Sequence, residues 1–293
     1  MIFCASKSNI RHFKTQKIIP LILSFPTHSA RELNTFDNTA GSKPILNRND
    51  LYISCRLNFY LKAVPLMKTT GTDPDIPILY EDNHLLVVNK PAGLLSQEDH
   101  TGRPDLLNIC KSYIKEEYNK PGNVFLGLMH RLDRPVSGVM VFGKTSKAAS
   151  RISEQIRARK VKKFYLAVLD GDPPPNGVLE HHLLKNHKTN VTEVVASPRR
   201  KSKLAKLSFK TIERVDTMAL VDVNLETGRA HQIRVQFADI GAPVHGDRRY
   251  GKASDNSIAL HAHKLRLIHP TQKEEMEFTA PIPSHAPWNL FKK

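Results

Sequence analysis

Residues 130 to 138 hold one carboxylate between two guanidinium groups. The stretch reads His-Arg-Leu-Asp-Arg-Pro-Val-Ser-Gly and places Asp133 between Arg131 and Arg134. Fixed cations favour the ionised form of a carboxylate, and Pro and Gly favour a turn over a continuing helix. Asp133 is therefore predicted to stand as an anion on a rigid loop, and such anions serve as nucleophiles in covalent catalysis. An Asp-Arg pair in an exposed loop is the ordinary alternative for the triplet taken alone.

Short strands and helices are predicted on the N-terminal side of this loop and directly after it. Two apolar runs, 78–80 and 85–88, flank Asp82-Asn83 and predict a hairpin. Apolar residues recur at helical spacing over 105–118. Residues 139–142 follow the loop as an apolar strand. The carboxylate is thus expected to lie at the start of a buried strand.

The segments further along the chain alternate between the same two kinds of element. Ser146 is predicted to cap a helix that carries Ile152 on its apolar face. Alternation over 164–169 predicts a strand in which Tyr165 faces opposite to Phe164. A half-buried strand is predicted over 219–225, and a short helix over 231–240 that stops at Gly241. Many short strands with few helices indicate an α+β domain built on a mixed or antiparallel sheet.

Several further blocks fit one known family when they are taken in order with the Asp133 loop. They are Tyr80 to Asp82 and Lys90 to Gly93 upstream, then Lys163 to Ala167, Gly228 to Val235, Gly241 to Asp247 with Tyr250-Gly251, and Leu260 to Ala262. Ordered blocks at such spacing are more specific than any single motif. Over about residues 76 to 283 the chain resembles the RluA-type pseudouridine synthases. The S4-type RNA-binding module of some relatives is not recognisable, which indicates the single-domain branch.

The resemblance implies a fold and a reaction. It implies a long curved sheet flanked by helices and loops, with the active cleft across its middle. It also implies an RNA pseudouridine synthase, an isomerase that moves the bond between uracil and ribose from N1 to C5. This reaction needs no cofactor and no metal. The expected partner is structured RNA, either tRNA, large-subunit ribosomal RNA or both.

The same resemblance implies roles for individual residues. Asp133 takes the position of the catalytic aspartate, which either attacks the sugar or removes a proton from it. Arg234 supplies its counter-charge. Tyr165 stacks on the target base and is a candidate to remove the C5 proton, with Leu260 as its apolar counterpart. Four more residues are candidates for substrate binding: His130, Arg131, Lys163 and Arg229.

His130 and Arg131 are candidates to fill the space left by a flipped base or to hold the flanking phosphates. For His130 a buried turn histidine bonded to the backbone is an equal alternative. Two positions depart from the family pattern, with Ala230 in place of the usual Thr and Gln236 in place of the usual His. Without the Thr hydroxyl, the loop that holds Arg229 is expected to be less rigid or to be capped by Thr227.

The charge of the chain agrees with a polyanionic partner. The net charge is +16, of which residues 1 to 66 carry +6 and the remainder +10. A basic field attracts RNA, DNA and anionic membranes alike, so charge alone does not choose among them. The basic segment 199–203 is expected to track the RNA backbone or to be a solvated loop. A non-catalytic RNA-binding protein or RNA chaperone of the same fold, and a hydrolytic nucleosidase, are the alternative functions.

The histidines and cysteines do not indicate a metal site or a disulfide framework. The three cysteines are far apart, and the histidines lack metal-ligand spacing. A reducing compartment is expected, and the cytoplasm is the predicted location. No obligate protein partner and no membrane association are indicated, so a monomer is expected.

Residues 1 to 66 are predicted to be an N-terminal extension, with the catalytic domain spanning 67 to 293. The extension contains none of the family blocks. It reads as a disordered segment, a targeting segment or an over-long start before Met67. A transit peptide there would make the location organellar.

Overall fold

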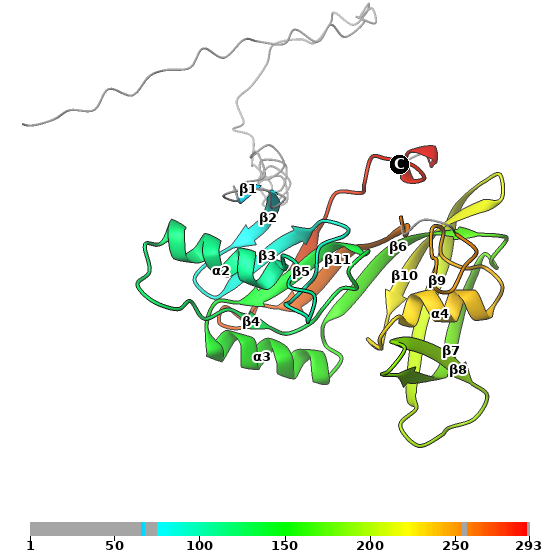
Figure 1. Ribbon diagram of the computed structural model, residues 1–293, viewed down its shortest axis with the longest axis horizontal. Helices are drawn as coiled ribbons and strands as arrows, with labels where there is room; N and C mark the ends of the chain where they lie inside the picture. The colour runs from blue at the N-terminus through cyan, green and yellow to red at the C-terminus, as the bar shows by residue number, and fades with distance from the viewer. Residues whose placement is uncertain (1–65, 68–74, 254–256, 292–293) are drawn as a thin grey trace, which may run out of the picture. The chain divides into compact units, whose positions relative to one another are not determined.

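The computed structural model describes residues 66–67, 75–253 and 257–291 (Figure 1). The predicted N-terminal extension lies outside the described residues except for Leu66. Leu66 and Met67 pair with Pro77 and Ile76, and Met67 is fully buried. The compact unit to which they belong spans Leu61–Lys293.

The strands form one mixed sheet of twelve strands within the described residues, which confirms the predicted α+β class. They are β1 (Leu66–Met67), β2 (Ile76–Glu81), β3 (Leu85–Lys90), β4 (Gly127–Leu128), β5 (Ser137–Gly143), β6 (Lys162–Asp170), β7 (Asn176–Asn186), β8 (Val191–Val195), β9 (Lys203–Val215), β10 (Met218–Leu225), β11 (Leu260–Ile268) and β12 (Glu275–Thr279). Their order is β1-β2-β3-β5-β11-β6-β10-β9-β7-β8, with β12 on β11 and β4 on β5. The pairing of β5 with β11 is parallel, and the other pairings are antiparallel.

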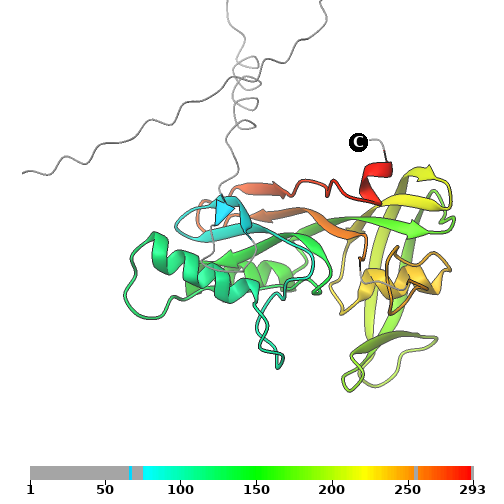
Figure 2. The same cartoon turned by 45° about the horizontal axis from the view of Figure 1, so that its top comes forward.

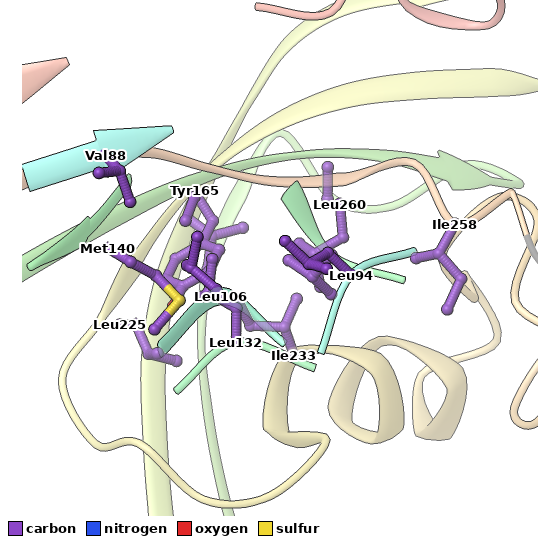
Figure 3. Close-up of a cluster of buried hydrophobic side chains, with 14 of the residues drawn as sticks. Val88, Leu94, Leu106, Leu132, Met140, Tyr165, Leu225, Ile233, Ile258 and Leu260 are labelled. Carbon is purple, nitrogen blue, oxygen red and sulfur yellow. The ribbon is translucent and has the colours of Figure 1, made fainter. Parts of the chain in front are cut away.

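The middle of the sheet brings together three predicted site segments. The Asp133 loop leads into β5, Leu260 begins β11, and Tyr165 lies in β6 on the other side of β11. Leu260 is paired with Ala167 of β6. The side chains of Tyr165 and Leu260 belong to one buried apolar cluster with Leu132 and Ile233 (Figure 3). Sequence segments about a hundred residues apart therefore meet at one place.

Helices cover both faces of the sheet. They are α2 (Leu106–Glu117), α3 (Ser146–Arg157), α4 (Gln232–Asp239) and the short 3-10 helix η1 (Trp288–Leu290). Apolar residues of α2 and α4 join the cluster that contains Tyr165, whereas Ile152 of α3 packs with Val87 and Val141 in a second cluster. Side chains alternate between faces along a strand, so α3 lies on the face opposite to α2 and α4.

Local chemistry accounts for the element boundaries. The carboxylate of Asp82 accepts the N–H groups of His84 and Leu85, which closes the predicted hairpin between β2 and β3. Asp105 caps α2 through the N–H of Asn108. Gly241 follows α4 with a φ of +78°, a conformation that favours glycine and ends the helix.

The predicted cap of α3 is wrong by one residue. Thr145, rather than Ser146, accepts the N–H of Ala148 and has the extended backbone of a capping residue. Ser146 is the first helical residue. Of the two alternatives for the loop that holds Arg229, the helix cap by Thr227 is not found, because residue 231 occupies the cap position of α4 without a side-chain bond. The Thr227 hydroxyl donates instead to Gln232 Oε1, and that oxygen also accepts the N–H of Arg229.

No helix within the described residues is long and apolar enough to cross a membrane.

Candidate active site

The loop that carries Asp133 is held from both sides by the end of β3 and the segment that follows it. The Ser96 hydroxyl donates to the Leu132 carbonyl at 2.7 Å and accepts the Leu132 N–H at 3.1 Å. On the other side, Lys90 Nζ donates to the Arg134 carbonyl at 3.1 Å. Backbone bonds immediately before and after Asp133 therefore fix where its carboxylate can point.

Lys90 is fully buried and has carbonyl acceptors for its ammonium protons. Besides Arg134, its Nζ donates to Pro91 at 2.9 Å and to Leu94 at 2.7 Å. Burial lowers the pKa of Lys90 to about 7, and the charge of Asp133 opposes this effect. Three acceptors match the three N–H groups of an ammonium, whereas a neutral amine would turn a lone pair toward one of them. The geometry therefore suits the charged form.

The end of the loop is fixed against β11. Gly138 has a φ of +119°, and a Cβ there would lie 2.3 Å from the Ala262 carbonyl oxygen, so a side chain would not fit. Ser137 Oγ lies 2.8 Å from His261 Nδ1. The Ser-Gly of the motif thus joins the loop to the central strand.

Arg234 links Asp133 to a second carboxylate, Asp247. Its Nη1 lies 3.1 Å from Asp133 Oδ2, while Nε and Nη2 lie 2.7 and 2.9 Å from the two oxygens of Asp247. Arg234 and Asp247 are buried, and 30% of the Asp133 side chain is exposed. The two hydrogen bonds that Arg234 donates to Asp247 set the plane of the guanidinium, which then presents one N–H to Asp133.

The charges of this triad are mutually stabilised. Burial alone would raise the pKa of Asp247, but the hydrogen bonds and charge of Arg234 bring it below its ordinary value. Burial opposes the charge of Arg234, but Asp247 and then Asp133 raise its pKa. Arg234 is thus a permanent cation beside Asp133.

Tyr165 and Leu260 provide an apolar wall beside Asp133. Both are buried, with 8% and 4% of their surface exposed, and both line the same cleft as Asp133. Burial and then the charge of Asp133 raise the pKa of the Tyr165 hydroxyl well above its ordinary value. The hydroxyl is therefore protonated at neutral pH.

The four predicted substrate-binding residues line this cleft but differ in their contacts. His130 Nε2 accepts the Val141 N–H at 3.0 Å, which is the backbone bond expected of a turn histidine. Burial and then the charge of Lys163 lower the pKa of His130 to about 3, so its ring is neutral. Burial also lowers the pKa of Lys163. Arg131 is exposed, and Arg229 donates to the Leu204 carbonyl at 2.9 Å.

The cleft itself is large and basic. Its volume is about 1300 Å³, which exceeds the usual range for pockets that hold a single small molecule. Eleven Lys or Arg side chains line it against four Asp or Glu. The loop that joins β3 to α2 and the β7–β8 hairpin both contribute lining residues, and Figure 2 shows both projecting on the same side of the sheet. The geometry suits an extended polyanion.

Four residues at the site were given no role from the sequence. They are Lys90, His231, Asp247 and Tyr250. Each lies in a block that carries the family resemblance, which is the one signal that could have marked them. Their contacts at the site are with residues far away in the sequence. Tyr250, for example, is 58 positions from Thr192.

Comparison with known proteins identifies the family. Residues 84–239 match the family model described as RNA pseudouridylate synthase. The chain is 35% identical over 226 residues to the ribosomal large subunit pseudouridine synthase D of Yersinia pestis, covering 71% of this chain and 67% of that protein. It is 32% identical over 215 residues to the uncharacterized RNA pseudouridine synthase YhcT of Bacillus subtilis (strain 168), covering 72% and 70%.

Solved structures agree with this result. Human RNA Pseudouridylate Synthase Domain Containing 4 superposes with a TM-score of 0.60 at 25% identity, covering 70% of this chain and 88% of that one. Human RNA Pseudouridylate Synthase Domain Containing 1 gives 0.58 at 25% identity, covering 73% and 86%. The chain belongs to the RNA pseudouridylate synthase family, as its resemblance to the RluA-type enzymes indicated. It is an RNA pseudouridine synthase, an isomerase, and the comparisons give no support to a non-catalytic function.

Proposed function

We propose that this enzyme converts specific uridines of structured RNA to pseudouridine through Asp133. One observation carries this assignment. Asp133 is the partly exposed carboxylate at which the fixed guanidinium of Arg234, the Tyr165 and Leu260 wall and the basic cleft all meet. A carboxylate so held can approach a ribose while the cleft keeps the detached uracil in place.

Two courses of the reaction are open to Asp133. In the first, a carboxylate oxygen attacks C1′ of the ribose while the C1′–N1 bond breaks, and uracil leaves with the electron pair on N1. In the second, Asp133 removes a proton from the sugar, and a glycal forms as uracil leaves. After the uracil turns, C5 bonds to C1′: in the first course it displaces the Asp133 carboxylate as the ester bond breaks, and in the second Asp133 returns the proton to the sugar. In both, the proton on C5 is then removed and N1 takes up a proton.

Tyr165 is proposed to stack on the uracil and to accept the C5 proton, with Leu260 against the other side of the base. The negative charge of Asp133 is one reason for the raised pKa of Tyr165. Attack on the sugar would convert that charge into a neutral ester. While the ester exists, one cause of the raised pKa of Tyr165 is absent, so the phenolate that accepts a proton would form more readily than in the free enzyme.

The four remaining cleft residues are proposed to bind the RNA around the target. Arg131 is exposed next to the catalytic position and is suited to fill the space that a flipped base leaves. Lys163 and Arg229 provide cationic groups for phosphates, and His130 supports the loop through its backbone bond while lining the cleft. The target uridine is proposed to flip out of the RNA stack into the cleft.

Large-subunit ribosomal RNA is the first proposed substrate, and tRNA the second. Relatives such as the Yersinia pestis protein are named for the ribosomal large subunit, which supports this order. A monomer is the proposed active form. The cytoplasm is the proposed location.

The experiment that tests this function maps pseudouridine in unmodified transcripts of large-subunit ribosomal RNA and of tRNA after incubation with the enzyme. We expect pseudouridine at a small set of uridines with wild type and none above background with Asp133→Asn. A nucleosidase would release free uracil, and an RNA chaperone would leave the transcripts chemically unchanged. Either result with wild type would contradict the proposal.

A further inference from the structure

His231 makes a second approach to the proposed catalytic carboxylate. Its Nε2 lies 3.8 Å from Asp133 Oδ2, the same oxygen that receives Arg234 Nη1. The His231 side chain is 8% exposed, and its φ of 54° is a left-handed conformation that is uncommon for residues other than glycine. Such backbone strain persists only where the surroundings fix the residue, and here it turns the ring toward Asp133.

Tyr250 fixes which nitrogen of His231 carries a proton. The Tyr250 hydroxyl oxygen accepts the Thr192 N–H at 2.8 Å and lies 2.8 Å from His231 Nδ1. Because the hydroxyl oxygen already accepts one N–H, donation of its proton to Nδ1 satisfies both groups. A neutral His231 therefore carries its proton on Nε2, which faces Asp133.

The β7–β8 hairpin anchors this arrangement. Thr192 lies in β8, and the guanidinium of Arg249 donates to the carbonyl of Asn190 in the hairpin turn. Asn190 and Lys185 of the hairpin also line the cleft. A chain of contacts thus runs from a cleft wall through Tyr250 and His231 to Asp133.

We propose that His231 is a positioning residue whose Nε2–H, at 3.8 Å and beyond hydrogen-bond distance, turns the positive end of its dipole toward Oδ2 and so orients Asp133 for reaction, with its tautomer set by Tyr250. This inference rests on the proposed role of Asp133. Because His231 and Arg234 both approach Oδ2, the pair directs the other oxygen, Oδ1, to the substrate.

The charge state of His231 matters for this role. Five groups face it from the packed elements: Asp133, Lys185, Arg234, Arg249 and the Tyr250 hydroxyl. Burial lowers the pKa of His231, Asp133 opposes this, and the three cations reinforce it. The neutral ring is thus the form present at neutral pH. Protonation at lower pH would place a further positive charge beside Asp133 and make its carboxylate less reactive.

The test compares His231→Gln, Tyr250→Phe and a control, Tyr80→Phe, in single-turnover conversion of the large-subunit ribosomal RNA transcript at saturating enzyme. Gln keeps an N–H donor but does not titrate. Tyr80 also loses a hydroxyl hydrogen bond, to Asp82 at 3.2 Å, but does not line the cleft. RNA affinity is measured in parallel, so that binding and chemistry are separated.

At pH 7.5 we expect Tyr250→Phe to lower the single-turnover rate about tenfold or more, with RNA affinity and the Tyr80→Phe rate near wild type. His231→Gln should retain most of the rate. The ratio of the wild-type rate to the His231→Gln rate should fall as pH decreases from 7.5 to 5, because only wild type acquires the extra charge.

Equal rates in wild type and Tyr250→Phe, together with a pH-independent ratio for His231→Gln, would overturn the proposal. Asp133→Asn is measured beside them. If Asp133→Asn is inactive while the other variants behave as wild type, only the proposed role of His231 is wrong and the proposed function stands. If Asp133→Asn is active, the proposed function itself fails.

Discussion

At the scale of residues, the site depends on how one charge is held. Asp247 fixes Arg234 through two hydrogen bonds, and Arg234 then offers a single N–H to Asp133. A buried cation with a buried partner stays in place without reorganisation, which is how preorganised charges contribute to catalysis. The reactive carboxylate is more exposed than either of them.

Substitution of Tyr165 separates stacking from proton transfer. Tyr165→Ala should weaken RNA binding by about 1 to 3 kcal/mol, because a stacking surface is lost. Tyr165→Phe should bind like wild type and fail in turnover, because the ring remains while the proton acceptor does not. The raised pKa also predicts that ionisation of Tyr165 in the free enzyme adds no change in RNA affinity between pH 6 and pH 9. Binding and single-turnover assays of both variants check this, and an active Tyr165→Phe would exclude the base role.

At the scale of elements, much of the order along the chain could be predicted from sequence. The hairpin at Asp82, the helix after Asp105 and the stop at Gly241 follow from local hydrogen bonds and backbone preferences. Thr145 and Ser146 are adjacent hydroxyl residues, and only the backbone geometry decides which of them caps α3.

The long-range contacts could not be predicted in this way. The bond from Lys90 to the Arg134 carbonyl spans 44 positions, and the contact of Arg234 with Asp133 spans 101. No local preference encodes such pairs, because they form only when the sheet brings β3, β5 and α4 together. The family resemblance predicted Arg234 as the partner of Asp133. That Asp247 fixes the guanidinium of Arg234 could be recognised only from the structure.

Lys90→Met tests how the last residue of β3 holds the catalytic loop. The change removes a buried donor from three carbonyls, of which the Arg134 carbonyl keeps the Gly93 N–H, so the free energy of unfolding should fall by about 3 kcal/mol. The exposed Lys147 on α3 provides a matched control, and Lys147→Met should stay within about 0.5 kcal/mol of wild type. Urea denaturation of both variants measures the difference. Equal stabilities would show that the ammonium contributes little to the loop.

At the scale of the whole molecule, the sheet supplies a cleft with basic walls, and the site lies where its central strands meet. The charge of the chain beyond residue 66 is +10 without any contribution from the N-terminal segment. The catalytic unit is therefore proposed to bind and modify RNA by itself.

Truncation tests this proposal. A chain that begins at Leu61 keeps the whole compact unit and every proposed site residue, so it should modify RNA at a rate close to that of the full chain. A chain that begins at Met67 loses Leu66 of β1 and places its charged amino group beside a buried residue, so it should be less stable. Thermal unfolding measures the stability of both truncated chains, and a turnover assay compares their rates with that of the full chain. An inactive Leu61 chain would mean that the preceding residues contribute to the fold or to RNA binding.

The most direct test of the account measures RNA binding and turnover separately for wild type and Asp133→Asn across a range of salt concentrations. If the basic cleft holds RNA mainly through phosphates, the logarithm of the affinity should fall linearly with the logarithm of salt, with the same slope for both proteins. Turnover should fall by at least about three orders of magnitude in Asp133→Asn while binding persists. Substantial turnover in Asp133→Asn, or loss of RNA binding together with turnover, would contradict the assignment of Asp133 as the catalytic carboxylate of a separate RNA-binding cleft.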